Sequence, residues 1–276
     1  MRLFEISRLT IRETQRRRIL WIGALMGVGF LVIFGLGFHF IFRDLERNLN
    51  PDEFSTPFTF LTLAGLYATN FLVIIVSVLI SVSTISGEIE SHTIESLLSK
   101  PINRWELLIG KWLGYALIIF VYVLVLPGGV LLIVYLRSGF SMDNIPLGLA
   151  VIYLEGLIGL TISIAGGTRL STLANGALAL MLFGIAFIGG WVEQIGALFR
   201  NETAVNIGIV TSLLMPTESL WRMASILFKP EIASGMDIAG PFIVAAQPSD
   251  LMILYSVVYA GALLALALLL FTRRDI

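Results

Sequence analysis

Six apolar segments, separated by more polar ones, dominate the pattern of hydrophobic and polar positions along the chain. A helix needs about 20 mainly apolar residues to cross the hydrocarbon core of a membrane, and each of the six segments reaches that length. The pattern therefore predicts an all-α polytopic membrane protein that forms a single domain over residues 1–276. Its six transmembrane helices are expected at residues 19–42, 58–86, 105–136, 147–168, 171–191 and 251–271.

Residues 1–18, ahead of the first span, carry apolar and basic side chains in a helical pattern. Leu3, Ile6 and Leu9 recur at a spacing of three, which keeps them on one side of a helix, with arginines on the other side. This pattern is typical of an amphipathic helix that lies in the headgroup layer, with a solvated helix start as the alternative.

Residues 87–104 form the only strongly charged cluster between two long apolar runs. Ile94, Leu97 and Leu98 are spaced to make an apolar ridge on a short amphipathic helix, which Pro101 must interrupt because proline lacks a backbone donor. A loop that contacts only water does not need such a ridge. We therefore expect this segment, called the central loop below, to dock into a groove of another protein.

The start of the third span carries two polar signals. Asn103 stands three residues before Glu106, which is the spacing of a capping box and predicts a helix start. Lys111 lies one turn further in, and its long side chain is expected to extend back to the membrane surface.

Polar residues also occur inside the spans. Asn70, Ser77 and Ser81 in the second span, followed by Thr84, fall on one helical face. Such a face either packs against a neighbouring helix or lines a path for cargo. Glu155 lies near the middle of the fourth span. A carboxylate inside a membrane is costly and usually marks a functional site, so Glu155 is a candidate for the same path. The structural alternative is a hydrogen bond between helices.

In the outer segment, residues 192–250, Pro216 ends one apolar run and another follows it, and neither run is long enough to cross a membrane. We expect re-entrant or interfacial helices here.

Cytoplasmic segments are enriched in lysine and arginine, and with six spans and the N-terminus inside, the inner segments hold twelve of the eighteen basic residues. This predicts that both termini and the central loop are cytoplasmic. The twelve are Arg2, Arg8, Arg12, Arg16, Arg17, Arg18, Lys100, Arg104, Lys111, Arg169, Arg273 and Arg274.

Composition narrows the classes of function. With 57% hydrophobic and 13% charged residues and a net charge of −1, the chain shows no basic surface for nucleic acid. It has no cysteine and two histidines far apart, so no catalytic residue, metal site or cofactor is assigned to it. Gly110-Lys111 is not an ATP-binding loop, because the earlier glycine is missing and Trp112 stands where a serine or threonine is needed.

The central loop also carries a family resemblance. Gly87-Glu88-Ile89-Glu90, Thr93-Ile94, Leu97-Leu98-Ser99, Pro101-Ile102-Asn103-Arg104 and Gly110-Lys111 resemble the signature of ABC-2-type ABC transporter permeases. Within these the chain is most similar to the branch named for multicopper-enzyme maturation permeases. His92 departs from that branch, which often has glycine there.

The resemblance implies a permease subunit, without enzymatic activity of its own, in the inner membrane of a prokaryote. It implies export driven by two separate cytosolic ATPase subunits, which hold ATP and magnesium, and a second permease copy or close paralogue, with membrane lipid around the pair. A secondary transporter or channel that uses Glu155 is the alternative. The residues expected to dock the ATPase are Glu88, Glu90, Thr93, Ile94, Glu95, Leu97, Leu98, Pro101 and Arg104.

Overall fold

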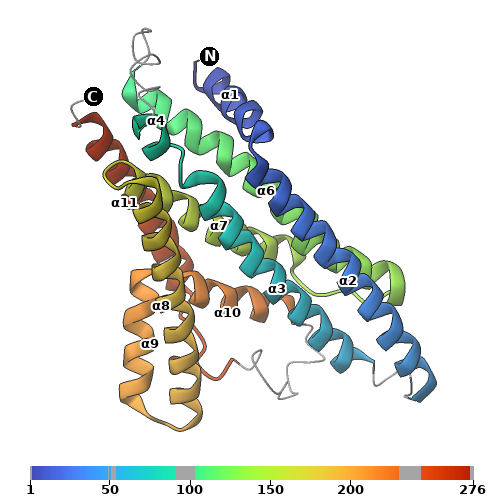
Figure 1. Cartoon of the computed structure of the whole chain (residues 1–276). Helices are drawn as coiled ribbons and strands as arrows, with labels where there is room; N and C mark the ends of the chain where they lie inside the picture. Colours follow the sequence, from blue (N-terminus) through green and yellow to red (C-terminus); the bar gives the residue numbers. More distant parts are fainter. Residues whose placement is uncertain (1, 49, 51–53, 91–102, 230–243, 274–276) are drawn as a thin grey trace.

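The computed structural model describes residues 2–48, 50, 54–90, 103–229 and 244–273. Every regular element in this part of the chain is a helix, which confirms the predicted all-α class. Figure 1 shows the helices as an elongated bundle. In chain order they are α1 (Arg2–Arg16), α2 (Arg18–Asn48), α3 (Ser55–Ser81), α4 (Ser86–Glu90), α6 (Arg104–Ser138), α7 (Ile145–Gly167), α8 (Thr172–Leu198), α9 (Glu202–Leu214), α10 (Thr217–Phe228) and α11 (Leu251–Thr272).

Six of these helices, α2, α3, α6, α7, α8 and α11, are long and apolar enough to cross a membrane, which confirms the six predicted spans. Their ends differ from the predicted bounds. Helix α2 continues to Asn48 and α8 to Leu198, both beyond the apolar residues, because helical hydrogen bonding does not stop where hydropathy falls. Helix α6 runs unbroken through Pro127.

Helices α3 and α7 form the centre of the bundle. In the most apolar stretches of α3 and α7, 61% and 67% of the residues are buried. In those of α2 and α11 only 11% are buried, and these two helices lie at the edge of the bundle. Small residues let α3 and α7 approach closely: a Cβ atom at Gly159 of α7 would lie 2.7 Å from the Ser77 hydroxyl of α3. Close packing through small residues is the usual basis of helix association in a membrane.

Helix α1 packs along the first turns of α6 and runs in the same direction, since Ile6 lies against Gly110 and Thr10 against Gly114. Not every residue on the predicted apolar face of α1 packs against α6. Ile6 is buried, but Leu9 is 62% exposed, and the buried line continues instead through Thr10 and Thr14. The threonines can be buried because each hydroxyl donates to the carbonyl four residues earlier. Placement of α1 in the headgroup layer stays a prediction.

Helices α8 and α9 form a hairpin, with α10 crossing the bundle beside them (Figure 1). Thr211 of α9 packs against Gly189 of α8, and Ala204 packs against Gly196. Helix α10 packs against α7, where the Phe228 ring covers Gly148. Helices α9 and α10 have 13 and 12 residues and are too short to cross, while their re-entrant or interfacial placement stays a prediction.

The start of α1, the short helix α4 and the end of α11 lie at one end of the bundle (Figure 1). The hairpin of α8 and α9 lies toward the other end. The central loop therefore leaves the bundle at the end where both ends of the described chain are found.

Candidate functional site: the base of the central loop

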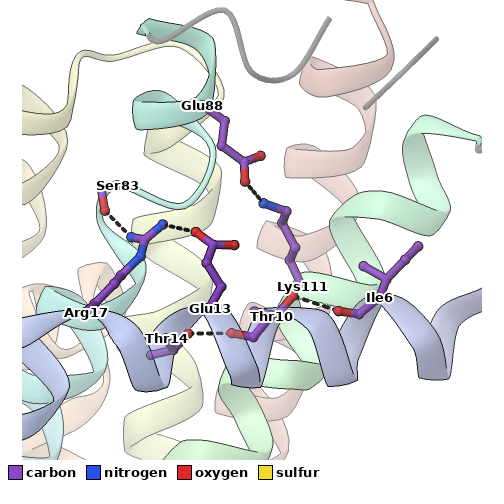
Figure 2. Close-up of polar contacts among 8 residues, drawn as sticks. All are labelled: Ile6, Thr10, Glu13, Thr14, Arg17, Ser83, Glu88 and Lys111. Carbon is purple, nitrogen blue, oxygen red and sulfur yellow. Dashed lines mark hydrogen bonds and ion pairs between the residues drawn. The ribbon is translucent and has the colours of Figure 1, made fainter. Parts of the chain in front are cut away.

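The central loop begins at α4, which is held to α6 by an ion pair between Glu88 and Lys111 (Figure 2). The two side chains are only 10% and 5% exposed, so the pair lies inside the packing of the protein. This corrects the prediction that Lys111 extends back to the membrane surface. A buried ammonium that meets a carboxylate keeps its charge compensated without reaching water.

Arg17, the residue between α1 and α2, contacts the same region. One guanidinium nitrogen of Arg17 donates to the Ser83 hydroxyl at 2.6 Å, and the other pairs with Glu13 at 2.5 Å (Figure 2). Helix α1 is in turn bound to α6, because the Ser7 hydroxyl donates to the Gly110 carbonyl at 2.8 Å. The entry to the loop is therefore connected to α1 and α6 together.

A third set of contacts connects the loop entry to α7 and α8. The hydroxyls of Ser86 and Thr172 lie 2.9 Å apart. The buried Asn175 amide donates to the Val82 carbonyl at 3.1 Å and to the Ser163 carbonyl at 2.7 Å. Asn175 thus bridges the end of α3, the end of α7 and the start of α8.

The loop ends at α6, whose first residues are fixed in two ways. The Glu106 carboxylate accepts from the Asn103 backbone N–H at 2.9 Å, and the predicted capping box is confirmed. Arg104 donates to the carbonyls of Thr272 at 3.2 Å and Phe271 at 3.5 Å, at the end of α11. A positive charge is favourable there because the last carbonyls of a helix carry partial negative charge.

The structure describes three of the nine predicted docking residues in part or in full. Glu88 and Arg104 contact their own chain, so they anchor the two ends of the loop instead of presenting free charge at its surface. The backbone of Glu90 ends α4, and its side chain lies outside the described residues. The other six also lie outside them: Thr93, Ile94, Glu95, Leu97, Leu98 and Pro101.

The structure brings together two of the predicted path residues. The Asn70 amide of α3 donates to Glu155 Oε2 of α7 at 2.9 Å, and Glu155 is fully buried. Ser77 and Ser81 are also buried, but their hydroxyls donate to carbonyls of their own helix. This polar face of α3 therefore makes packing contacts with α7.

A second charged contact, which the sequence pattern did not reveal, holds α10 against the end of α8. Arg222 pairs with Glu193 at 2.7 Å, and both side chains are less than 10% exposed. Arg222 also donates to the Ala246 carbonyl at 3.0 Å, and Glu218 lies nearby on α10. Burial, opposed by Arg222 and reinforced by the charge of Glu193, raises the pKa of Glu218 to about 7.

Each of these ion pairs includes a charge that stands alone in an apolar segment, and this lone charge is a signal that the sequence shows. The partner of that charge lies far away along the chain. Glu88 and Lys111 are 23 residues apart, and Glu193 and Arg222 are 29 apart. Helical spacing relates only residues within about two turns, so the pattern could not pair them.

Two comparisons with known proteins bear on the family of this chain. A model of the ABC-2 family transporter proteins matches residues 6–276, which is nearly the whole chain. The chain is 30% identical over 236 residues to a protein of Pseudomonas aeruginosa named "Probable ABC transporter permease protein NosY", covering 80% of this chain and 82% of the relative. That relative is consistent with the multicopper-enzyme maturation branch, so the resemblance carried by the central loop is confirmed. The chain belongs to the ABC-2 family of transporter proteins.

Proposed function

We propose that this permease subunit works with two cytosolic ATPase subunits and a second permease copy, and that it exports its cargo. The observation that carries the proposal is the anchoring of both ends of the central loop. Its entry contacts α6, α8 and Arg17, which pairs with Glu13 of α1, and its exit contacts the end of α11. A force applied to the loop would therefore reach α6, α8 and α11 directly and α1 through Arg17, which is what coupling ATP hydrolysis to transport requires.

The mechanism follows from these contacts. ATP and magnesium bind in the partner ATPase, whose two subunits close on each other. The apolar ridge of Ile94, Leu97 and Leu98 fits a groove of the ATPase, and the loop moves with it as a rigid body. Because Glu88 and Arg104 hold the two ends of the loop, α6 and α11 move too, and the bundle opens a path between the two permease copies.

The proposed location is the inner membrane of a prokaryote, with both termini in the cytoplasm. Two observations support it. The basic residues of the sequence are concentrated in segments that this orientation places inside. The start of α1, the loop base and the end of α11 also lie at one end of the bundle, as this orientation requires (Figure 1).

The proposal is tested by purifying the tagged chain from its native membrane in a mild detergent and identifying what co-purifies. We expect a soluble ATPase in equal molar amount. Leu97→Asp with Leu98→Asp should then release the ATPase or uncouple its activity from transport, because two carboxylates replace the apolar ridge. The matched control is Leu97→Met with Leu98→Met, which keeps the ridge apolar and should retain coupling. An Asp variant that stays fully coupled would contradict the docking role.

A secondary transporter or channel remains the second candidate, and one observation favours it. Glu155 Oε1 and Asn70 Oδ1 are buried without a hydrogen-bond partner among the described residues, and they lie at the middle of the central helices. If they bind a cation, the chain alone in liposomes should pass cations without ATP, and Glu155→Gln should abolish that flux. Absence of flux from the unmodified chain would exclude this candidate.

A further inference from the structure

A groove of about 350 Å³ runs between α6 and the consecutive helices α1 and α2. Its walls are almost entirely apolar, and the side chains of several are half exposed. A groove of this volume is large enough for a ligand chain and needs an apolar occupant. The wall residues used below are Ile11, Gln15, Trp21, Ala24, Leu117 and Val121.

One end of this groove is rimmed by positive charge. Ile11 and Gln15 of α1 line the groove. Arg8 stands three residues before Ile11, and Arg12 stands three residues before Gln15, so both arginines lie on the side of α1 that faces the groove. Arg18 begins α2 at the same end. All three arginines are exposed. The rim therefore offers a site for a negatively charged group next to an apolar channel.

Trp21 lies at the end of the groove where the arginines are, and it indicates that this end is at the boundary between water and membrane. Its indole N–H donates to the Gln15 carbonyl at 2.8 Å, while the ring is part of the groove and the residue is 65% exposed. Tryptophan with its polar edge paired and its ring in apolar surroundings is typical of the headgroup level of a bilayer. The charged rim and the apolar groove thus meet where a lipid changes from headgroup to acyl chain.

We propose that this groove binds an anionic phospholipid, with one acyl chain between α2 and α6 and the phosphate held by Arg8, Arg12 and Arg18. Clusters of basic residues beside a transmembrane helix attract anionic lipids. A second copy of this chain is a poorer occupant, because a symmetric contact through this face would bring the two arginine rims together. The proposal is independent of the ATPase partner.

The first test measures lipid binding by native mass spectrometry of the purified chain with phosphatidylglycerol or phosphatidylcholine of the same acyl chains. We expect a preference of at least tenfold for phosphatidylglycerol. Each arginine at a membrane surface contributes about fivefold to such binding, so Arg8→Gln with Arg12→Gln should lower it about 25-fold. Arg200→Gln, an exposed arginine in the turn between α8 and α9, is the control and should change nothing.

The second test separates the groove from the rim. Ala24→Phe or Val121→Phe, on opposite walls, should fill the groove and lower phosphatidylglycerol binding at least fivefold, whereas Ile33→Phe on the exposed face of α2 should not. In a protein whose other four tryptophans are replaced by phenylalanine, acyl chains brominated near the headgroup should quench Trp21 fluorescence, and quench it less when Ala24→Phe is added. Using two wall variants keeps the test valid if one of them does not fold.

Three results would overturn the proposal: equal binding of the two lipids, no loss of binding in a folded wall variant, or displacement of the bound lipid by inorganic phosphate alone. The last would mean that the arginines bind free phosphate and the groove holds no acyl chain.

Discussion

Replacing Lys111 by methionine removes the ammonium group that pairs with the mostly buried Glu88 carboxylate. The Glu88 side chain is only 10% exposed, and that of Lys111 is 5% exposed, so little water can solvate the remaining charge. Removing one partner of a buried ion pair costs about 3–5 kcal/mol. Because α4 has only five residues and lies at one end of the bundle (Figure 1), we expect a loss near the lower end, about 3 kcal/mol, most of it through local opening where α4 meets α6.

The double variant Glu88→Gln with Lys111→Met removes both charges and should lie within about 1 kcal/mol of the parent, because no buried charge then remains at either position. The coupling energy between the two positions should therefore exceed about 2 kcal/mol. The chain contains no cysteine, so a single thiol introduced by Ile85→Cys, at a buried position, reports the opening of the loop base.

The assay combines the free energy of unfolding in mixed micelles with the rate at which the thiol introduced by Ile85→Cys reacts with a maleimide. The thiol should be protected in the parent, reactive in Lys111→Met and protected again in the double variant. The reasoning is refuted if Lys111→Met costs less than about 1 kcal/mol with the thiol still protected, or if the double variant is as unstable as the sum of the single ones.

Two further predictions concern packing and pH. Gly110→Val should lower the free energy of unfolding by about 1–3 kcal/mol more than the control Gly29→Val. The reason is that a Cβ atom at Gly110 would lie 2.6 Å from Ile6, whereas a Cβ atom at Gly29 would have nothing within 4 Å. Equal losses of stability in thermal unfolding would contradict the packing of α1 on α6. Glu218 has a pKa raised from 4.5 to about 7, so the folded protein holds a proton that the unfolded chain releases between these values. Stability should therefore fall as pH rises from about 4.5 to about 7, and Glu218→Gln, but not the exposed Glu202→Gln, should remove that slope.

Much of the fold was predictable from hydropathy, because a membrane requires long apolar helices with their backbone groups paired internally. Lys111 shows where such reasoning ends. A lysine one turn inside a span is expected to extend to the surface when its surroundings are unknown. The structure provides Glu88 as a buried partner, and this partner lies on another helix at a distance that no local pattern encodes.

The sequence predicted where the candidate site lies, but not the contacts that its residues make. The charged central loop was identified by contrast with the apolar runs on either side, but the roles of Glu88 and Arg104 depend on α6 and α11 lying beside it. Asn70 and Glu155 were each recognised as polar residues in a span, yet nothing in their own segments indicated that they bond to each other.

By itself the sequence determined the six spans, the short outer helices, the capped start of α6 and the place of the central loop. These follow from local properties: the length of apolar runs, the position of proline and the spacing of capping residues. The tertiary structure decided which faces meet, that α1 packs on α6 through Ile6, and which buried charges are paired. The physical reason is that helix formation depends on neighbours within a few residues, whereas charge compensation and close packing depend on residues that only folding brings together.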